Sequence, residues 1–193
     1  MTNIDSVSII TMETTKIGKF TMYIAGTGTV SIDWGNGSVI ENRNLYAWDE
    51  NLDDLYEDIF AFVCNYSNAS TNSITITGNN ITHLLCDENN ISALDVSKYA
   101  DLIYLTCSRN QLSTLNLNNN IALKNLNCCD NQLVDLDISN NINLSTLYCT
   151  GNQLTNLDIR KNTNLFVLCC ESIKMLDINN NSKHCRVFFN YEQ

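Results

Sequence analysis

Proline is absent from this 193-residue sequence, and basic residues are scarce. Because proline cannot donate to a backbone ladder, its absence suits long runs of paired backbone. Only 11 Lys and Arg stand against 21 Asp and Glu, which gives a formal net charge of −10. Such an acidic chain lacks the electrostatic footprint for phosphate backbones or anionic lipids, so we expect neither nucleic acid nor a membrane surface as a partner.

Long apolar runs and targeting signals are missing as well. No run approaches the roughly 20 apolar residues of a membrane span, so membrane insertion is not expected. The first residues, Met1 to Asp5, have neither a basic start nor an apolar core, so we expect no signal peptide in this sequence. The nine cysteines are an odd number, which argues against a disulfide framework.

The sequence does contain a 21-residue repeat. Five cysteines recur at this spacing, a leucine precedes each cysteine by two residues, and an Ile or Leu precedes that leucine by three. An Asn follows four of the cysteines by three residues, and an Ile or Leu comes two residues later. The unit reads L-x-x-L-x-C-x-x-N-x-L, and its cysteines are Cys86, Cys107, Cys128, Cys149 and Cys170.

This spacing predicts a stack of short parallel strands. The leucine and the cysteine lie two residues apart, so both point to the same side of a strand. Successive turns about 4.8 Å apart would join each apolar position into a buried column. The five cysteines are then core residues, because cysteine packs as a small hydrophobe. The Asn that follows them would satisfy backbone groups at one corner, and a second Asn column would do so at the opposite corner: Asn120, Asn141, Asn162 and Asn181.

Two features depart from the regular repeat. Cys129 and Cys169 fall on outward positions beside the core cysteines, so we expect these two thiols to be exposed. After Cys170 two residues are missing, and the spacing changes from 21 to 19. Residues 187–189 then read as a sixth, closing strand, with Phe189 in the core column and Phe188 in an outward column.

The repeat resembles the leucine-rich-repeat family, whose unit is L-x-x-L-x-L-x-x-N/C-x-L. The 21-residue variant with Cys in the strand is similar to short repeats in surface and secreted proteins of Bacteroides-type bacteria. The resemblance covers about residues 79 to 191. It implies a mainly β fold in which residues 79–193 form a solenoid of five to six turns with a parallel sheet on one face. It also implies a secreted or cell-surface location, whereas the free cysteines would suit a cytoplasmic one.

Residues 1–78 lack the repeat and are predicted to form a separate β-domain that caps the solenoid. Strands are expected at 20–24, 29–33 and 73–77, with a hairpin turn at 35–37 and a return strand at 38–41. Trp34 is expected to anchor this core. Residues 49–60 carry apolar residues at helical spacing and could form a short acidic helix or an irregular loop.

The hairpin with Trp34-Gly35-Asn36-Gly37 and the closing strand Ile74-Thr75-Ile76-Thr77 resemble the PKD-type immunoglobulin-like sandwich. Asn36 stands where that family has Asp, and Cys64 stands where it has His. The resemblance implies a small β-sandwich in front of the solenoid.

No catalytic motif stands out, so we expect no enzyme activity and no cofactor. His83 and His184 lie at opposite ends of the predicted solenoid and cannot pair on a metal. Asp137, Asp158 and Asp177 belong to an acidic column. They are either a solvated ladder, which we favour, or a Ca²⁺ site, because stacked carboxylates repel one another.

Function is therefore predicted to rest on the outward side chains of the strands, with a protein as partner and a glycan as the alternative. Two other interpretations are a structural spacer without a specific ligand and, more remotely, the substrate-recognition part of a leucine-rich-repeat effector enzyme. Phe188 would leave an apolar patch for weak self-association, and the alternative, which we favour slightly, is that the residues after it fold over the end as a cap. The expected contact residues are Tyr104, Thr106, Asn125, Asn127, Thr146, Tyr148 and Val167.

Overall fold

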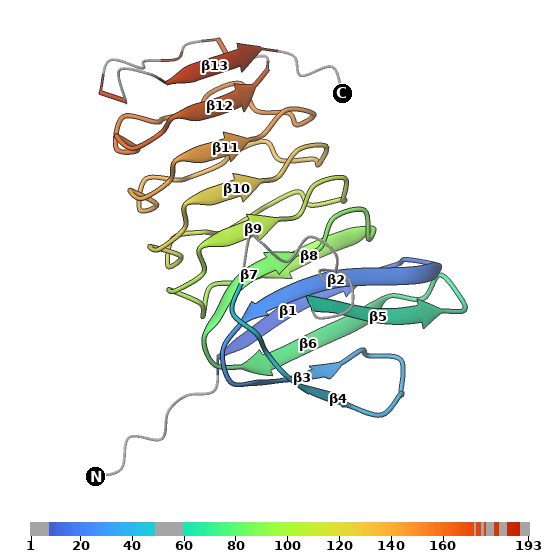
Figure 1. Ribbon diagram of the computed structural model, residues 1–193. Coiled ribbons are helices and arrows are strands. Elements are labelled where there is room, and N and C mark those ends of the chain that lie inside the picture. Colours follow the sequence, from blue (N-terminus) through green and yellow to red (C-terminus); the bar gives the residue numbers. More distant parts are fainter. Residues whose placement is uncertain are drawn as a thin grey trace.

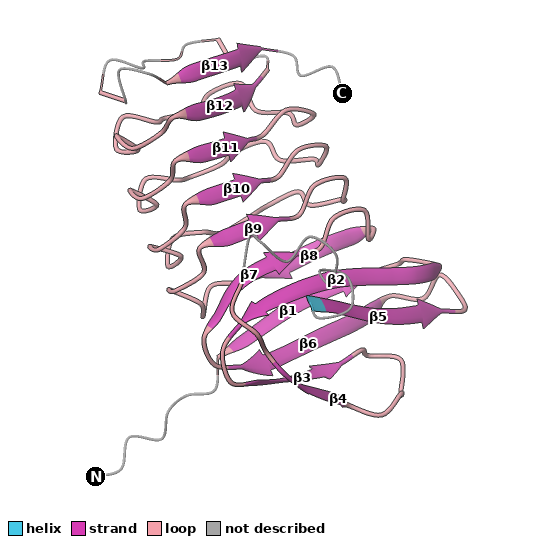
Figure 2. Ribbon diagram, in the orientation of Figure 1, coloured by secondary structure: helices cyan, strands magenta, loops and turns pink. Residues whose placement is uncertain are grey.

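The computed structural model describes residues 8–48, 60–171, 173–174, 176, 180–181 and 185–189. Their regular elements are β-strands, arranged in two sheets (Figures 1 and 2). None of the described residues forms a helix that is long and apolar enough to cross a membrane.

The repeats form a ladder of short parallel strands joined by turns (Figure 1). Each strand lies opposite the equivalent residues of the next turn: Leu126, for example, faces Leu105 on one side and Leu147 on the other. The 21-residue register is therefore confirmed. These strands are β7 (Ile81–Leu85), β9 (Tyr104–Thr106), β10 (Asn125–Asn127), β11 (Thr146–Tyr148), β12 (Val167–Cys170) and β13 (Arg186–Phe189).

The predicted core columns are confirmed. The leucines of the L-x-x-L-x-C-x-x-N-x-L unit and the five column cysteines have at most 3% of their surface exposed, and they belong to one hydrophobic core. Stacking is what buries them, because a single turn has no second layer to cover its apolar side chains.

Both asparagine columns satisfy backbone groups at the corners, as predicted. At the first corner, Asn110 Nδ2 donates to the carbonyl oxygens of Cys86 in the preceding turn and Cys107 in its own turn, both over 3.0 Å. At the second corner, Asn141 Nδ2 donates to the carbonyl oxygens of Leu117 (3.0 Å) and Asn120 (2.8 Å). Each side chain thus ties two successive turns together.

The register change near the end is also confirmed. Leu168 lies opposite Val187, and Cys170 lies opposite Phe189, so β13 follows β12 at a spacing of 19 residues. Phe189 occupies the predicted column but is 59% exposed, contrary to the expectation that it fills the core. Among the described strands β13 pairs on one side only, so nothing described covers this ring.

The front of the chain adds strands to both sheets (Figure 1). In the larger sheet β2 pairs antiparallel with β7, so the repeat ladder continues into the front part. The smaller sheet has the order β4-β3-β6-β1-β8. The strands of the front part are β1 (Ile9–Thr14), β2 (Gly18–Gly26), β3 (Thr29–Asp33), β4 (Glu41–Asn44), β5 (Ala61–Tyr66) and β6 (Asn72–Gly78). The remaining strand of the smaller sheet, β8 (Ile91–Asp95), comes from the repeat part and pairs antiparallel with β1.

Several front elements differ from expectation. The return strand covers Glu41–Asn44 rather than 38–41, because the turn after β3 is longer than a tight hairpin. The strands at 9–14 and 61–66 were not predicted. Trp34 is buried and packs edge-to-face on Phe20 with 5.9 Å between ring centroids, as expected of a core anchor. The expected helix at 49–60 lies, except for Phe60, outside the described residues.

Candidate functional site: the strand face of the larger sheet

The outward side chains of the larger sheet form columns that run from strand to strand, and we call this surface the strand face. The strand register places His83, Tyr104, Asn125, Thr146 and Val167 in a first column. Leu85, Thr106, Asn127, Tyr148 and Cys169 form a second column. All seven predicted contact residues therefore lie together on one surface.

Two members of the second column are less accessible than their position suggests. Thr106 is only 6% exposed, because its hydroxyl donates to the carboxylate of Asp87 in the preceding turn. Cys169 is 1% exposed, which contradicts the expected exposed thiol. In the register Cys169 lies between Tyr148 and Phe188, whose larger rings flank it. The accessible part of this column is thus formed by the larger side chains.

An aromatic cluster lies at the first turns of the strand face. Trp48 stacks on the ring of His83 with 4.8 Å between centroids and 4° between the planes, and His83 stacks on Tyr104 at 5.7 Å. Burial in this stack lowers the pKa of His83 to about 4. Trp48 comes from the front of the chain, outside the repeat, so repeat spacing gives no signal for its position.

The strand face also extends beyond the repeats, which the sequence did not indicate. In the register Tyr23 of β2 lies opposite Leu85 of β7 and opposite Ala61 of β5. Thr21 lies opposite Val63, which is exposed. The surface that sequence analysis assigned to the solenoid therefore continues across two strands of the front part.

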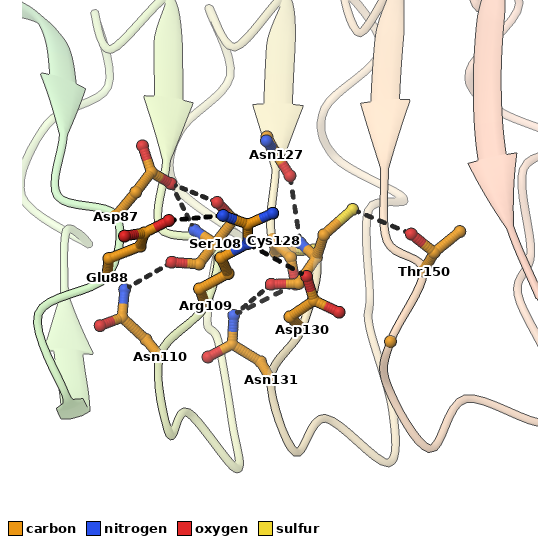
Figure 3. Close-up of polar contacts among 12 residues, drawn as sticks. Asp87, Glu88, Ser108, Arg109, Asn110, Asn127, Cys128, Asp130, Asn131 and Thr150 are labelled. Carbon is orange, nitrogen blue, oxygen red and sulfur yellow. Dashed lines mark hydrogen bonds and ion pairs between the residues drawn. The ribbon is translucent and has the colours of Figure 1, made fainter. Parts of the chain in front are cut away.

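Charged side chains line the turns that follow β7, β9 and β10 (Figure 3). Asp87 accepts hydrogen bonds from the backbone N–H of Ser108 (2.6 Å) and from its hydroxyl (2.7 Å). Arg109 lies between two acids, 2.5 Å from Glu88 and 3.7 Å from Asp130. We call Asp87, Glu88, Asp130 and Glu171 the acidic flank.

The thiols do not form a reactive site. Cys107 and Cys128 are fully buried, and burial raises their pKa values well above the usual range. Cys129 is half-buried with its sulfur 3.2 Å from the hydroxyl of Thr150, and burial raises its pKa too. Because the thiolate is the nucleophile, this arrangement suits packing rather than catalysis.

The acidic column on the opposite corner caps turns. Asp137 Oδ1 accepts from the backbone N–H of Ser139 (2.9 Å), and Asp158 binds Arg160 through its carboxylate (2.6 Å). These hydrogen bonds lower the pKa values of both acids. Among the described residues no group of three or more His, Cys, Asp or Glu could hold a metal. Asp177 lies outside them, so the two interpretations of this column, the favoured solvated ladder and the alternative Ca²⁺ site, stay untested.

Three phenylalanines are exposed around the end of the ladder. Phe188 lies in the column of Cys169, as predicted, and is 41% exposed. Phe166 is also exposed and lies under the guanidinium of Arg186, 5.8 Å from its ring centroid. His184 and residues 190–193 lie outside the described part of the chain.

Comparison with solved structures identifies similar repeat proteins. The functional domain of InlJ from Listeria monocytogenes, described as including a cysteine ladder, is 38% identical over 52% of this chain and 23% of its own, with a TM-score of 0.51. Two further structures from that organism are internalin C2 (21% identity, TM-score 0.46, 55% of this chain and 51% of its own) and the internalin inlF (28%, 0.41, 51% and 32%). The repeat part has the leucine-rich-repeat solenoid fold.

No protein-family model matches the chain, and no curated protein matches it either. The aligned part of this chain corresponds to 23% of the length of the InlJ domain, which is less than a quarter. The shared feature is the stack of cysteines, which here runs from Cys86 to Cys170 through the core.

Proposed function

We propose that the protein is a non-catalytic interaction module that binds another protein through the strand face. The observation that carries this proposal is the register that aligns partly exposed polar and aromatic side chains over successive turns. Asn125, Thr146 and Tyr148 belong to this surface, and each is about half-buried. A rigid ladder of this kind loses little freedom on binding, and tyrosine is a common energetic anchor at interfaces.

Two finer assignments belong to the same proposal. The front part is a PKD-like module, which is supported by its two facing sheets and by the buried Trp34 after β3. Its proposed boundary with the solenoid comes after residue 78, the last residue of β6. The location is secreted or cell-surface, as the similarity to short surface repeats implies.

A matched pair of substitutions tests the strand face. Thr146→Arg places a long cation in the first column, whereas Thr163→Arg places the same side chain at an exposed turn position away from that column. We expect proteins captured by the wild type and by Thr163→Arg to be depleted at least tenfold with Thr146→Arg, as judged by quantitative mass spectrometry. Identical capture by all three proteins, or capture by none, would refute binding through this face.

Weak self-association through Phe188 is a second proposal, supported by the exposed rings of Phe166, Phe188 and Phe189. Exposed apolar patches often mark contact surfaces. Light scattering over a concentration series should show a mass that rises with concentration, and Phe188→Asp should abolish the rise. A constant monomer mass for the wild type would end this proposal.

A further inference from the structure

We propose that Asn36 is a site of spontaneous deamidation, at which the backbone nitrogen of Gly37 displaces the side-chain amide nitrogen as ammonia. The product is a mixture of aspartate and isoaspartate at position 36. The site lies in the loop between β3 and β4, which projects from the smaller sheet at the end of the molecule opposite β13 (Figure 1).

The reaction proceeds through a cyclic imide. Hydroxide removes the proton of the Gly37 N–H, and the nitrogen then attacks Cγ of Asn36. The new N–Cγ bond closes the ring as the Cγ–Nδ2 bond breaks, and Nδ2 takes a proton from water and leaves as ammonia. Water opens the imide at either of its two carbonyl groups, so one product is aspartate and the other is isoaspartate, whose backbone passes through the former side chain.

The residue after Asn36 leaves its own nitrogen uncovered. Glycine has no Cβ, so it hinders attack by its nitrogen less than any other residue. The sequence contains seven glycines, and Gly37 is the one that directly follows an asparagine. Even an added Cβ at Gly37 would meet nothing within 4 Å. The cyclic imide and the lengthened isoaspartyl backbone therefore have room.

The attacking nitrogen is also free of hydrogen bonds. Within the described part of the chain, the N–H of Gly37 donates to no acceptor. Asn36 and Gly37 are both exposed, so water and hydroxide reach them. Residues 34–40 belong to no strand, because β3 ends at Asp33 and β4 begins at Glu41. Conversion therefore breaks no bond of the sheet.

The side-chain amide of Asn36 is held at both of its polar atoms. Oδ1 accepts from the backbone N–H of Ser38 over 3.0 Å, and Nδ2 donates to Cys64 Sγ over 3.2 Å. Attack on Cγ places negative charge on Oδ1. The Ser38 N–H already points at this oxygen and stabilises the charge as it develops.

The asparagines of the first corner are protected from the same reaction. Each is followed by a glutamine, and the backbone N–H of that glutamine donates to the preceding turn. Attack would therefore break a bond that joins two turns. The three bonds are Gln111 to Ile91 O, Gln132 to Leu112 O and Gln153 to Leu133 O, each 2.8 Å long.

Conversion changes the chemistry beside Cys64. A carboxylate replaces the amide that donated to its sulfur, so the thiol, a weak donor, becomes the donor of this contact. Aspartate at position 36 keeps an oxygen for the Ser38 N–H, and it is the residue of the PKD-type hairpin at this place. The aspartyl form is thus expected to keep the loop, whereas the isoaspartyl form inserts one more carbon into its backbone.

Peptide mass spectrometry of protein kept at pH 8.5 and 37 °C measures conversion at every asparagine, because each event makes its peptide about 1 Da heavier. We expect Asn36 to convert at least tenfold faster than the first-corner asparagines. Gly37→Ala, whose Cβ crowds the attacking nitrogen, should slow conversion at Asn36 at least fivefold. The matched control is Gly28→Ala, which should leave the rate unchanged. Gly28 has a similar φ (+86° against +78°) and equally open surroundings, but it follows Thr27.

The same measurement in guanidinium chloride separates the effect of the fold from that of the sequence. Unfolding should speed conversion at the first-corner asparagines at least tenfold, because their glutamine N–H groups are released. Asn36 should convert in the native protein at no less than one tenth of its unfolded rate. A lower native rate at Asn36, native conversion of the first-corner asparagines as fast as that of Asn36, or an unchanged rate in Gly37→Ala would overturn the inference.

Discussion

The side-chain amide of Asn131 donates a hydrogen bond to the carbonyl oxygen of Cys107, one turn earlier in the solenoid, over 3.0 Å. The same nitrogen donates to the carbonyl of Cys128 in its own turn (3.2 Å), and Oδ1 accepts from the backbone N–H of Leu112 (2.9 Å). One buried side chain thus replaces the backbone pairing that a corner interrupts.

Asn131→Ala should lower the free energy of unfolding by about 3 kcal/mol, because the buried carbonyls of Cys107 and Cys128 and the N–H of Leu112 lose this partner. Urea denaturation measures the change. The control is Asn140→Ala, since Asn140 is exposed and makes one bond to the carbonyl of Asn118. Asn140→Ala should lower the free energy of unfolding by less than about 0.5 kcal/mol. Equal effects of the two substitutions would show that the asparagine column is not what joins the turns.

Thiol labelling should separate the core column from the other cysteines. In native protein we expect iodoacetamide to modify Cys129 and Cys185 slowly, since both are half-buried and burial raises their pKa values. The five column thiols and Cys169 should stay unmodified, and urea should make all nine reactive. Peptide mass spectrometry reads out each site. Fast native modification of Cys107 or Cys128 would contradict their burial.

The sequence predicted the solenoid well because its information is local and repeated. The spacing of Cys86, Cys107 and Cys128 fixes which residues face the core, and the shift to 19 residues fixes the position of β13. Asn110 and Asn120 could be placed at corners for the same reason, since buried backbone groups there need partners.

The front part could be predicted only in fragments because strand pairing depends on distant residues. The strand at 20–24 was expected, yet nothing in its sequence indicates that Tyr23 pairs with Leu85. The stack of Trp48 on His83 depends on how the front part folds back over the ladder. Burial of Thr106 and Cys169 depends on their particular neighbours, which an alternating pattern does not encode.

A glycine in the first corner allows a direct test of backbone conformation. Gly151 has φ of +68°, and a Cβ there would lie 2.9 Å from the backbone of Asp130. Gly37 has a similar φ of +78°, but a Cβ there would meet nothing within 4 Å. We expect Gly37→Ala to cost about 1 kcal/mol of stability and Gly151→Ala roughly 2–4 kcal/mol. Equal costs in chemical denaturation would mean that the turns can separate without penalty.

Protonation of His83 should destabilise the protein in acid. Burial between Trp48 and Tyr104 lowers its pKa to about 4 from an ordinary value of 6.5, so the folded state favours neutral imidazole. The stability that depends on a neutral His83 side chain is fully present above pH 6.5. It decreases below pH 6.5 and is lost as the pH falls through about 4. We expect the free energy of unfolding to fall over this range by at most about 1.4 kcal/mol per pH unit from this one group. His83→Phe keeps a ring in the stack and removes the titration of this side chain, and every other titratable residue is the same in both proteins. The stability difference between the wild type and His83→Phe should therefore change between pH 7 and pH 4. If the stability difference stays constant over this range, the pKa of His83 is the same in the folded and the unfolded protein, and the prediction is wrong.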